Sequence, residues 1–241
     1  MKEDHHRFIL DQIQKRSGKP TQHTFLDSYL GNSHPRYPID NPGMRGIARE
    51  FMRANKQLSA GKFEEVLTSL IHGESATEKM MAGFLLDYSK LDQRKFKPKV
   101  FDDWLNQLQG WAEIDTLCTG KYSRTEIPAQ WQSWEPLLKK FAKSKNIGKR
   151  RASLVFLVAP MRYTQDSELS HMAFQNILQL SGERDVLITK AISWLLRSMI
   201  SLYRKDVMTF VNENAGSLPA IAVRETRVKL TTGTKGKKKS G

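Results

Sequence analysis

Residues 185–203, with the sequence DVLITKAISWLLRSMISLY, decide the fold of this chain. Apolar side chains recur every three or four positions from Val186 to Ile200. This spacing places them on one broad side of an α-helix and differs from the two-residue alternation of a half-buried strand. The stretch therefore predicts an amphipathic helix.

The same helical spacing recurs along the rest of the chain, and strand signals are almost absent. Helix starts are marked by Asn41-Pro42, by Asn146, and by Ser-x-x-Glu capping boxes at Ser75–Glu78 and Ser123–Glu126. A loop with several prolines and glycines is expected at 17–41. We expect helices at residues 4–16, 43–57, 62–71, 76–91, 98–108, 111–118, 123–143, 147–159, 167–180, 184–203, 204–214 and 217–229.

These closely spaced helices predict an all-α architecture of antiparallel helix pairs. Two arrangements fit the pattern, a helix bundle or a stacked array of helical repeats. Repeats of the HEAT type are often too divergent to be visible in one sequence. An α-α superhelix of HEAT-like repeats has a concave face, and a concave basic groove suits a DNA duplex. We expect one domain over residues 1–230, followed by a disordered basic tail at 231–241.

Composition indicates a basic globular protein. The net charge of +14 predicts attraction to polyanions such as nucleic acid or an anionic membrane surface. No stretch approaches the roughly 20 apolar residues that cross a bilayer, and no secretory leader is expected from the polar N-terminal residues. Cys118 is the only cysteine, so no intrachain disulfide can form, and a cytoplasmic location is expected. The histidines lack metal-ligand spacing, so a metal site is not expected.

Basic residues are concentrated in the C-terminal half of the chain. Residues 139–162 include eight basic residues and no acidic one, and residues 224–241 include seven basic residues and a single acid, Glu225. Lys149, Arg150 and Arg151 directly precede a strongly apolar helical segment. Such one-sided clusters favour contact with phosphates, with an ordinary solvated surface as the alternative.

Two tryptophans stand at helical spacing from charged residues. Trp111 and Asp115 are four residues apart and share one face of the predicted helix, and Trp194 and Arg197 are three apart. Each pair also has an ordinary structural explanation, because a tryptophan in an amphipathic helix more often packs in or near the core. The neighbouring charges could be a helix cap and a salt-bridge partner. The spacings alone indicate only a basic helical protein that binds nucleic acid.

Three segments resemble the AlkD-like DNA alkylation repair proteins, a family built from HEAT-like helical repeats. Trp111-x-x-Ile114-Asp115 resembles the family's Trp-x-x-Val/Ile-Asp motif, and Lys149–Leu154 resembles its Arg-Ala-Ala-Ile-Leu helix start. Lys190–Arg197 resembles its Lys-Ala-Ile-x-Trp-x-Leu-Arg helix. The resemblance covers about residues 25–230. It includes Tyr29-Leu30-Gly31, followed by Pro35 and Arg45, which is similar to the family's N-terminal segment.

The resemblance implies a monofunctional DNA glycosylase that excises positively charged N3- and N7-alkylpurines from double-stranded DNA without flipping the base. By position, Asp115 matches the family's catalytic carboxylate, and Trp111 and Trp194 match two tryptophans of its concave groove. Arg151 matches a groove arginine. The resemblance implies no metal or organic cofactor, and we expect a monomer that meets the nucleoid through DNA. Further DNA contacts are expected from Lys149, Arg150 and Arg197.

Two positions depart from the family pattern and bear on substrate range more than on reaction type. Ala112 stands where the best-known members have an aspartate, and Gln22 lies near the place of a tyrosine found in some members. Two other functions stay open. One is a non-catalytic binder of branched or damaged DNA with the same fold, and the other is a helical-repeat scaffold for an acidic protein partner.

Overall fold

A computed structural model describes residues 5–19, 31 and 33–234 of the chain. All regular structure in these ranges is helical, which confirms the all-α prediction for the described part. Contacts divide the chain into two compact units, residues 1–122 and 123–241. The predicted single domain over 1–230 stays a prediction. The last helix extends to Thr232, and residues 235–241 of the predicted tail lie outside the described residues.

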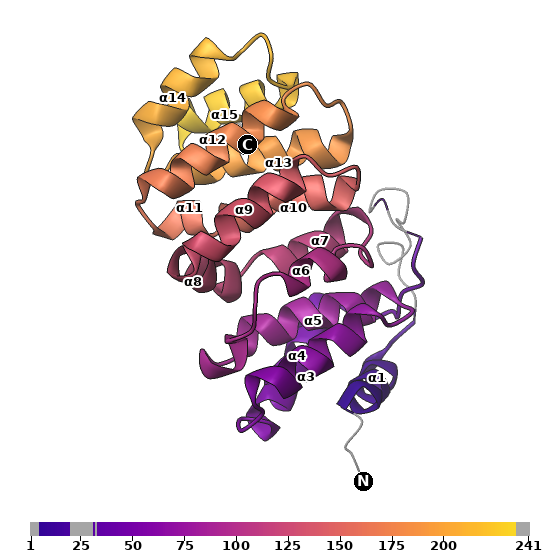
Figure 1. The fold of residues 1–241 in the computed structure, drawn as a ribbon. Helices are drawn as coiled ribbons and strands as arrows, with labels where there is room; N and C mark the ends of the chain where they lie inside the picture. Colours follow the sequence, from indigo (N-terminus) through magenta and orange to yellow (C-terminus); the bar gives the residue numbers. More distant parts are fainter. Residues whose placement is uncertain (1–4, 20–30, 32, 235–241) are drawn as a thin grey trace. The chain divides into compact units, whose positions relative to one another are not determined.

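The N-terminal unit is organised around one central helix, α5, which packs against α3, α4 and α7 (Figure 1). Nearly every residue of α5 from Ala76 to Leu86 is buried, as expected of a helix surrounded by others. The elements of this unit are α1 (His5–Arg16), α3 (Asn41–Ala54), α4 (Ala60–Ile71), α5 (Ala76–Tyr88), the 3₁₀ turn η2 (Asp92–Arg94), α6 (Val100–Trp104) and α7 (Gly110–Cys118).

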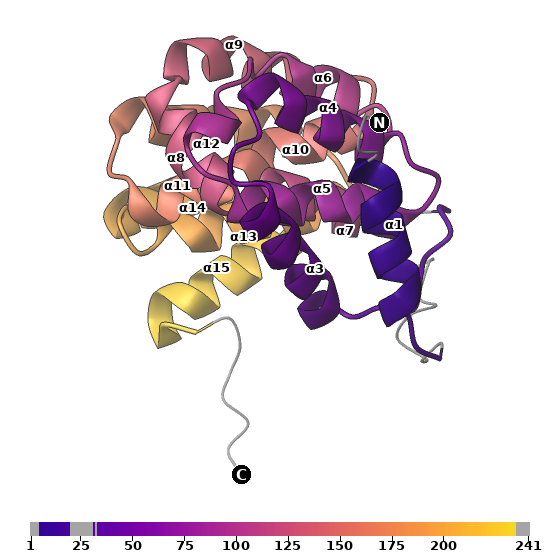
Figure 2. The same ribbon diagram turned by 90° about the horizontal axis from the view of Figure 1, so that it is seen from below.

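The C-terminal unit has two central helices, α10 and α13, which pack against each other. α10 also contacts α9 and α12, whereas α13 contacts α15, which lies beside it in Figure 2. Trp134 and Phe156 fill the space between α9 and α10, with ring centroids 4.7 Å apart. The helices are α8 (Lys121–Ala129), α9 (Trp131–Ala142), α10 (Ile147–Val158), α11 (Pro160–Tyr163), α12 (Ser167–Leu180), α13 (Val186–Met199), α14 (Arg204–Glu213) and α15 (Ala220–Thr232).

Two of the four predicted helix starts are confirmed. Ser75 and Glu78 form a capping box at the start of α5, and the Asn146 side chain accepts hydrogen bonds from the first amides of α10. The cap of α3 is Asp40, so the prediction of Asn41 was wrong by one residue. The capping box predicted at Ser123 was also wrong, because α8 begins at Lys121 and Ser123 is buried inside it.

The helix predicted at 123–143 is two helices in the structure. α8 contains Pro128 and ends at Ala129. Gln130 leaves the helical conformation at φ −119° and ψ 35°, and α9 begins at Trp131. The helix predicted at 98–108 is also shorter, since α6 covers only Val100–Trp104. Of the loop predicted at 17–41, residues 20–30 and 32, and with them Gln22, lie outside the described residues.

Candidate nucleic-acid interface

Trp111 and Asp115 lie one turn apart on α7 of the N-terminal unit. Both residues are partly exposed, whereas Ile114 and Leu117 of the same helix are each 1% exposed and pack into the core. Asp115 is therefore partly accessible at the surface of the unit. The helix provides one face that carries an indole and a carboxylate together.

Glu113 holds the start of α7 in place. The backbone N–H of Gln109 donates to Glu113 Oε2 at 2.8 Å, and His34 Nδ1 lies 2.8 Å from Glu113 Oε1. The side-chain oxygen of Gln109 in turn accepts from the backbone N–H and the hydroxyl of Ser33, at 3.0 and 2.9 Å. One glutamate thus fixes both the first turn of α7 and the segment at 33–34 that covers it.

Glu113 was not predicted as a functional residue, and it is 0% exposed although it lies between Trp111 and Asp115 in the chain. Burial raises the pKa of its carboxyl group above the ordinary value. Hydrogen bonds from Gln109 and His34, with the charge of Lys79, offset this only in part. The spacing could have predicted this burial. Glu113 is two residues from both Trp111 and Asp115, so it lies on the opposite side of the helix from the surface pair.

The contact between α5 and α7 is unusually close at Gly83. A Cβ atom at this position would lie 2.2 Å from the carbonyl oxygen of Thr116 and 2.9 Å from the backbone nitrogen of Leu117. Both are backbone atoms, so no side-chain rotation could relieve the clash. Because Thr116 directly follows Asp115, this contact fixes the position of the backbone that carries the carboxylate.

Trp194 and Arg197 lie one turn apart on α13 of the C-terminal unit. Trp194 is partly exposed, whereas the adjacent Ser193 and Leu195 are fully buried. Arg197 Nε donates to Ser193 Oγ at 3.2 Å and lies 3.3 Å from Glu225 Oε2. Burial lowers the pKa of the Arg197 guanidinium below its ordinary value, and the charge of Glu225 opposes this shift.

The three successive basic residues at the start of α10 have different surroundings. Arg150 binds Glu183 through Nε and Nη2 at 2.6 and 3.2 Å, and its Nη1 donates to two carbonyl oxygens of the preceding turn at 2.9 Å each. Lys149 and Arg151 are only 9% and 4% exposed, and Arg151 Nη1 donates to the carbonyl oxygen of Leu187. All three side chains thus hold positions within the fold of the unit.

The structure therefore places the members of each sequence pair side by side within one unit. Trp111 and Asp115 share α7, and Trp194 and Arg197 share α13. Convergence of the two pairs on one groove stays a prediction. The roles predicted for Lys149, Arg150 and Arg151 in binding DNA likewise stay predictions.

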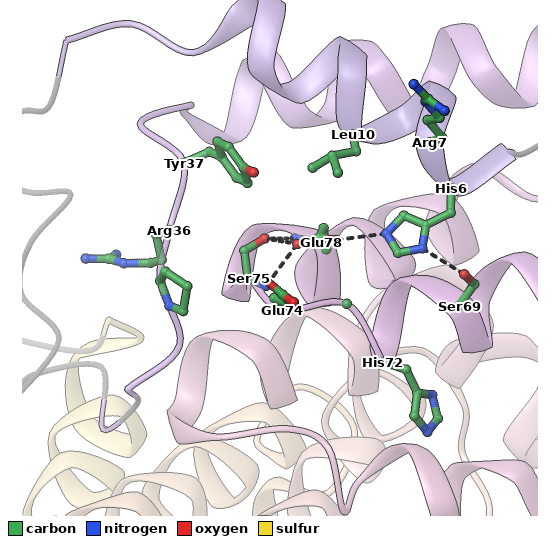
Figure 3. Close-up of a pocket in the computed structure, with 12 residues that line it drawn as sticks. His6, Arg7, Leu10, Arg36, Tyr37, Ser69, His72, Glu74, Ser75 and Glu78 are labelled. Atoms are coloured by element: carbon green, nitrogen blue, oxygen red, sulfur yellow. Dashed lines mark hydrogen bonds and ion pairs between the residues drawn. The ribbon is translucent and has the colours of Figure 1, made fainter.

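A cavity of about 830 Å³ lies in the N-terminal unit and contains none of the predicted site residues. His6 of α1 crosses it: Nδ1 lies 2.7 Å from Ser69 Oγ of α4, and Nε2 lies 2.8 Å from Glu78 Oε1 of α5 (Figure 3). One imidazole therefore ties α1 to both helices. The lining residues are His6, Arg7, Leu10, Pro35, Arg36, Tyr37, Ser69, His72, Gly73, Glu74, Ser75 and Glu78.

We expect the link through Glu78 to weaken in acid. Burial alone would raise the pKa of the Glu78 carboxyl, but hydrogen bonds from His6 and Ser75 together outweigh it and leave the pKa below the ordinary value. A carboxyl whose folded pKa is lowered adds stability above its unfolded pKa of about 4.3, and this stability is lost as pH falls through the folded pKa. Glu78→Gln should therefore lower the free energy of unfolding by about 1–2 kcal/mol at pH 6.

Urea unfolding of both proteins between pH 6 and pH 3 checks this expectation. The difference between wild type and Glu78→Gln should shrink as the wild-type carboxylate takes up its proton. A difference that stays constant over this pH range would show that the charge of Glu78 does not contribute.

The described residues also show what this part of the chain lacks. No group of three or more His, Cys, Asp or Glu residues among them is arranged to hold a metal ion. No helix in the same ranges is long and apolar enough to span a bilayer. Cys118 lies buried at the end of α7.

Comparisons with known proteins bear on both the chain and its fold. The sequence model of one family, described as DNA alkylation repair enzyme, matches residues 12–230. Among solved structures, a predicted DNA alkylation repair enzyme from Enterococcus faecalis is similar, with a TM-score of 0.72 and 15% sequence identity over 90% of this chain and 99% of that chain. At this identity the likeness shows a shared fold. No curated protein gives a significant match.

Proposed function

The chain belongs to the family of DNA alkylation repair enzymes, and from this premise we propose that it hydrolyses the N-glycosidic bond of N3- and N7-alkylated purines in duplex DNA. Family membership itself gives a role in DNA repair with DNA as the substrate. The observation that carries the finer proposal is the partly exposed pair of Trp111 and Asp115 on one face of α7.

Asp115 is the proposed catalytic carboxylate. Alkylation at N3 or N7 makes the purine cationic, so the base leaves as a neutral molecule when the bond from the sugar C1′ to nitrogen breaks. The sugar then carries oxocarbenium-like positive charge. A carboxylate at the surface can stabilise this charge and orient a water molecule, whose oxygen bonds to C1′ while its proton passes to the carboxylate or to solvent.

Trp111 and Trp194 are proposed to hold the cationic nucleotide while it remains stacked in the duplex. The face of an indole attracts a nearby cation by about 1–2 kcal/mol when water is excluded. Both indoles are partly exposed in their units, which this role requires. The role also requires the two units to present them to one duplex.

Arg197 is the proposed phosphate contact with the strongest structural support. Its side-chain contacts with Ser193 and Glu225 both involve Nε, and this leaves the two terminal nitrogens to face a phosphate. The proposal does not depend on Arg150, whose guanidinium nitrogens are engaged by Glu183 and the turn before α10. Contacts of Lys149 and Arg151 with DNA would be made by the small portions of these side chains that are exposed.

The direct test is to incubate the purified protein with N-methylated duplex DNA and to separate any released base by chromatography. We expect free 3-methyladenine and 7-methylguanine to accumulate with time. Unmethylated duplex and heat-inactivated protein serve as controls. Tight binding to branched or methylated DNA with no released base would contradict the proposal and favour a non-catalytic DNA binder with the same fold.

A further inference from the structure

Three basic side chains from three helices gather around the last turn of α13. Lys229 of α15 donates from Nζ to the carbonyl oxygen of Arg197 at 2.7 Å. Arg162 of α11 donates from Nε to the hydroxyl of Ser198 at 3.2 Å. Because α13 packs against both α11 and α15, these contacts place three positive charges within one turn of helix.

Glu225 is the one carboxylate for which the described residues show a contact with this cluster. Its Oε2 lies 3.3 Å from Arg197 Nε and accepts a hydrogen bond from Ser193 Oγ at 2.6 Å. Three positive charges therefore meet one negative charge. Burial lowers the pKa of Lys229, and the charges of Arg162 and Arg197 lower it further. The folded unit thus tolerates a repulsion among cations that an incoming anion would relieve.

We propose that Arg162, Arg197 and Lys229 form a phosphate site for the backbone of duplex DNA, with Glu225 as an internal counter-ion. Ser193 and Glu225 hold Arg197 by Nε, which suits a side chain that grips phosphate with its two terminal nitrogens. Lys229 donates one Nζ hydrogen to the carbonyl oxygen of Arg197 and has two more that can bind a phosphate. The identity of the ligand, duplex DNA, rests on the proposed function.

The location also fits a backbone contact beside the predicted base-binding surface. Arg197 is one turn from Trp194 on α13, so a phosphate held here lies near a nucleotide that touches the indole. Arg162 is exposed and Lys229 is partly exposed, so both can meet a strand that passes across the end of α13. Phosphate contacts of this kind fix register and add affinity without reading sequence.

The salt dependence of binding to unmodified duplex tests the site without requiring any chemistry. The slope of log K against log salt concentration is negative, and each lost phosphate contact reduces its magnitude by about 0.9. We expect this reduction for Lys229→Gln and for Arg162→Gln. Lys205→Gln, an equal charge change at an exposed position on α14, should leave the slope nearly unchanged. Reductions no larger than that of the control would overturn the proposal.

Glu225→Gln gives the opposite and more diagnostic result. The amide oxygen can still accept from Ser193 and Arg197, while the negative charge is gone. We expect binding to unmodified duplex about threefold tighter at low salt, an effect that misfolding cannot imitate. Affinity equal to or below the wild-type value, with urea unfolding unchanged, would contradict the role of Glu225.

These results are separable from the proposed activity. If the wild-type protein releases no alkylated base but the three variants behave as expected, the glycosylase proposal fails and the phosphate site stands. If base is released and the variants bind like the wild type, the site fails and the activity stands.

Discussion

The Asp115→Asn protein is expected to bind alkylated duplex almost as tightly as the wild type but to release base about 10²–10⁴-fold more slowly. The amide has the shape of the carboxylate but no charge, so it loses the stabilisation of the oxocarbenium-like sugar and the acceptance of a proton from water. Because Asp115 is partly exposed on α7, the substitution should not disturb the core. Single-turnover release of 7-methylguanine measures the chemical step.

The matched control is Asp103→Asn, which removes the same charge from an exposed position on α6 of the same unit. Its rate of base release should equal that of the wild type. Equal rates for the wild type and Asp115→Asn would remove the carboxylate from the mechanism. A parallel loss of binding and rate would instead assign Asp115 to substrate binding.

The helices could be predicted because their signals are local. The apolar spacing of residues 185–203 identified α13, and the side chains of Ser75 and Asn146 cap helices with partners within three residues. The same motif failed at Ser123, because α8 begins two residues earlier, at Lys121, and Ser123 lies inside the helix. The motif does not report where the helix begins, because the confirmed capping box at Ser75 and Glu78 is itself buried.

The surface pairs could be predicted from spacing, but the residues that support them could not. Glu113 is bound by His34, 79 positions away, and Arg150 by Glu183, 33 positions away. No local pattern links such partners, because tertiary packing alone brings them together. For the same reason the sequence predicted phosphate contacts for all three basic residues at 149–151, although Arg150 forms an ion pair with Glu183.

Gly83→Ala is expected to lower the free energy of unfolding by about 3 kcal/mol or more, because one added carbon forces two helices apart. The new Cβ would lie 2.2 Å from the carbonyl oxygen of Thr116, and neither backbone can move without displacing α5 or α7. At an unobstructed helix position, a glycine-to-alanine substitution adds about 1 kcal/mol of stability, because alanine has the higher helix propensity. The expected effect at Gly83 has the opposite sign. Urea unfolding followed by circular dichroism measures the difference.

Gly61→Ala is the control that separates close packing from helix propensity. Gly61 lies in the first turn of α4, and a Cβ there meets no atom within 4 Å, so this variant should be as stable as the wild type or slightly more stable. Opposite signs for the two substitutions would show that the α5–α7 contact sets the position of α7. Because Thr116 follows Asp115, any Gly83→Ala protein that still folds should also lose base release, whereas Gly61→Ala should retain it. Equal stability of the two variants would mean that α7 can shift freely and that its contact with α5 does not position the carboxylate.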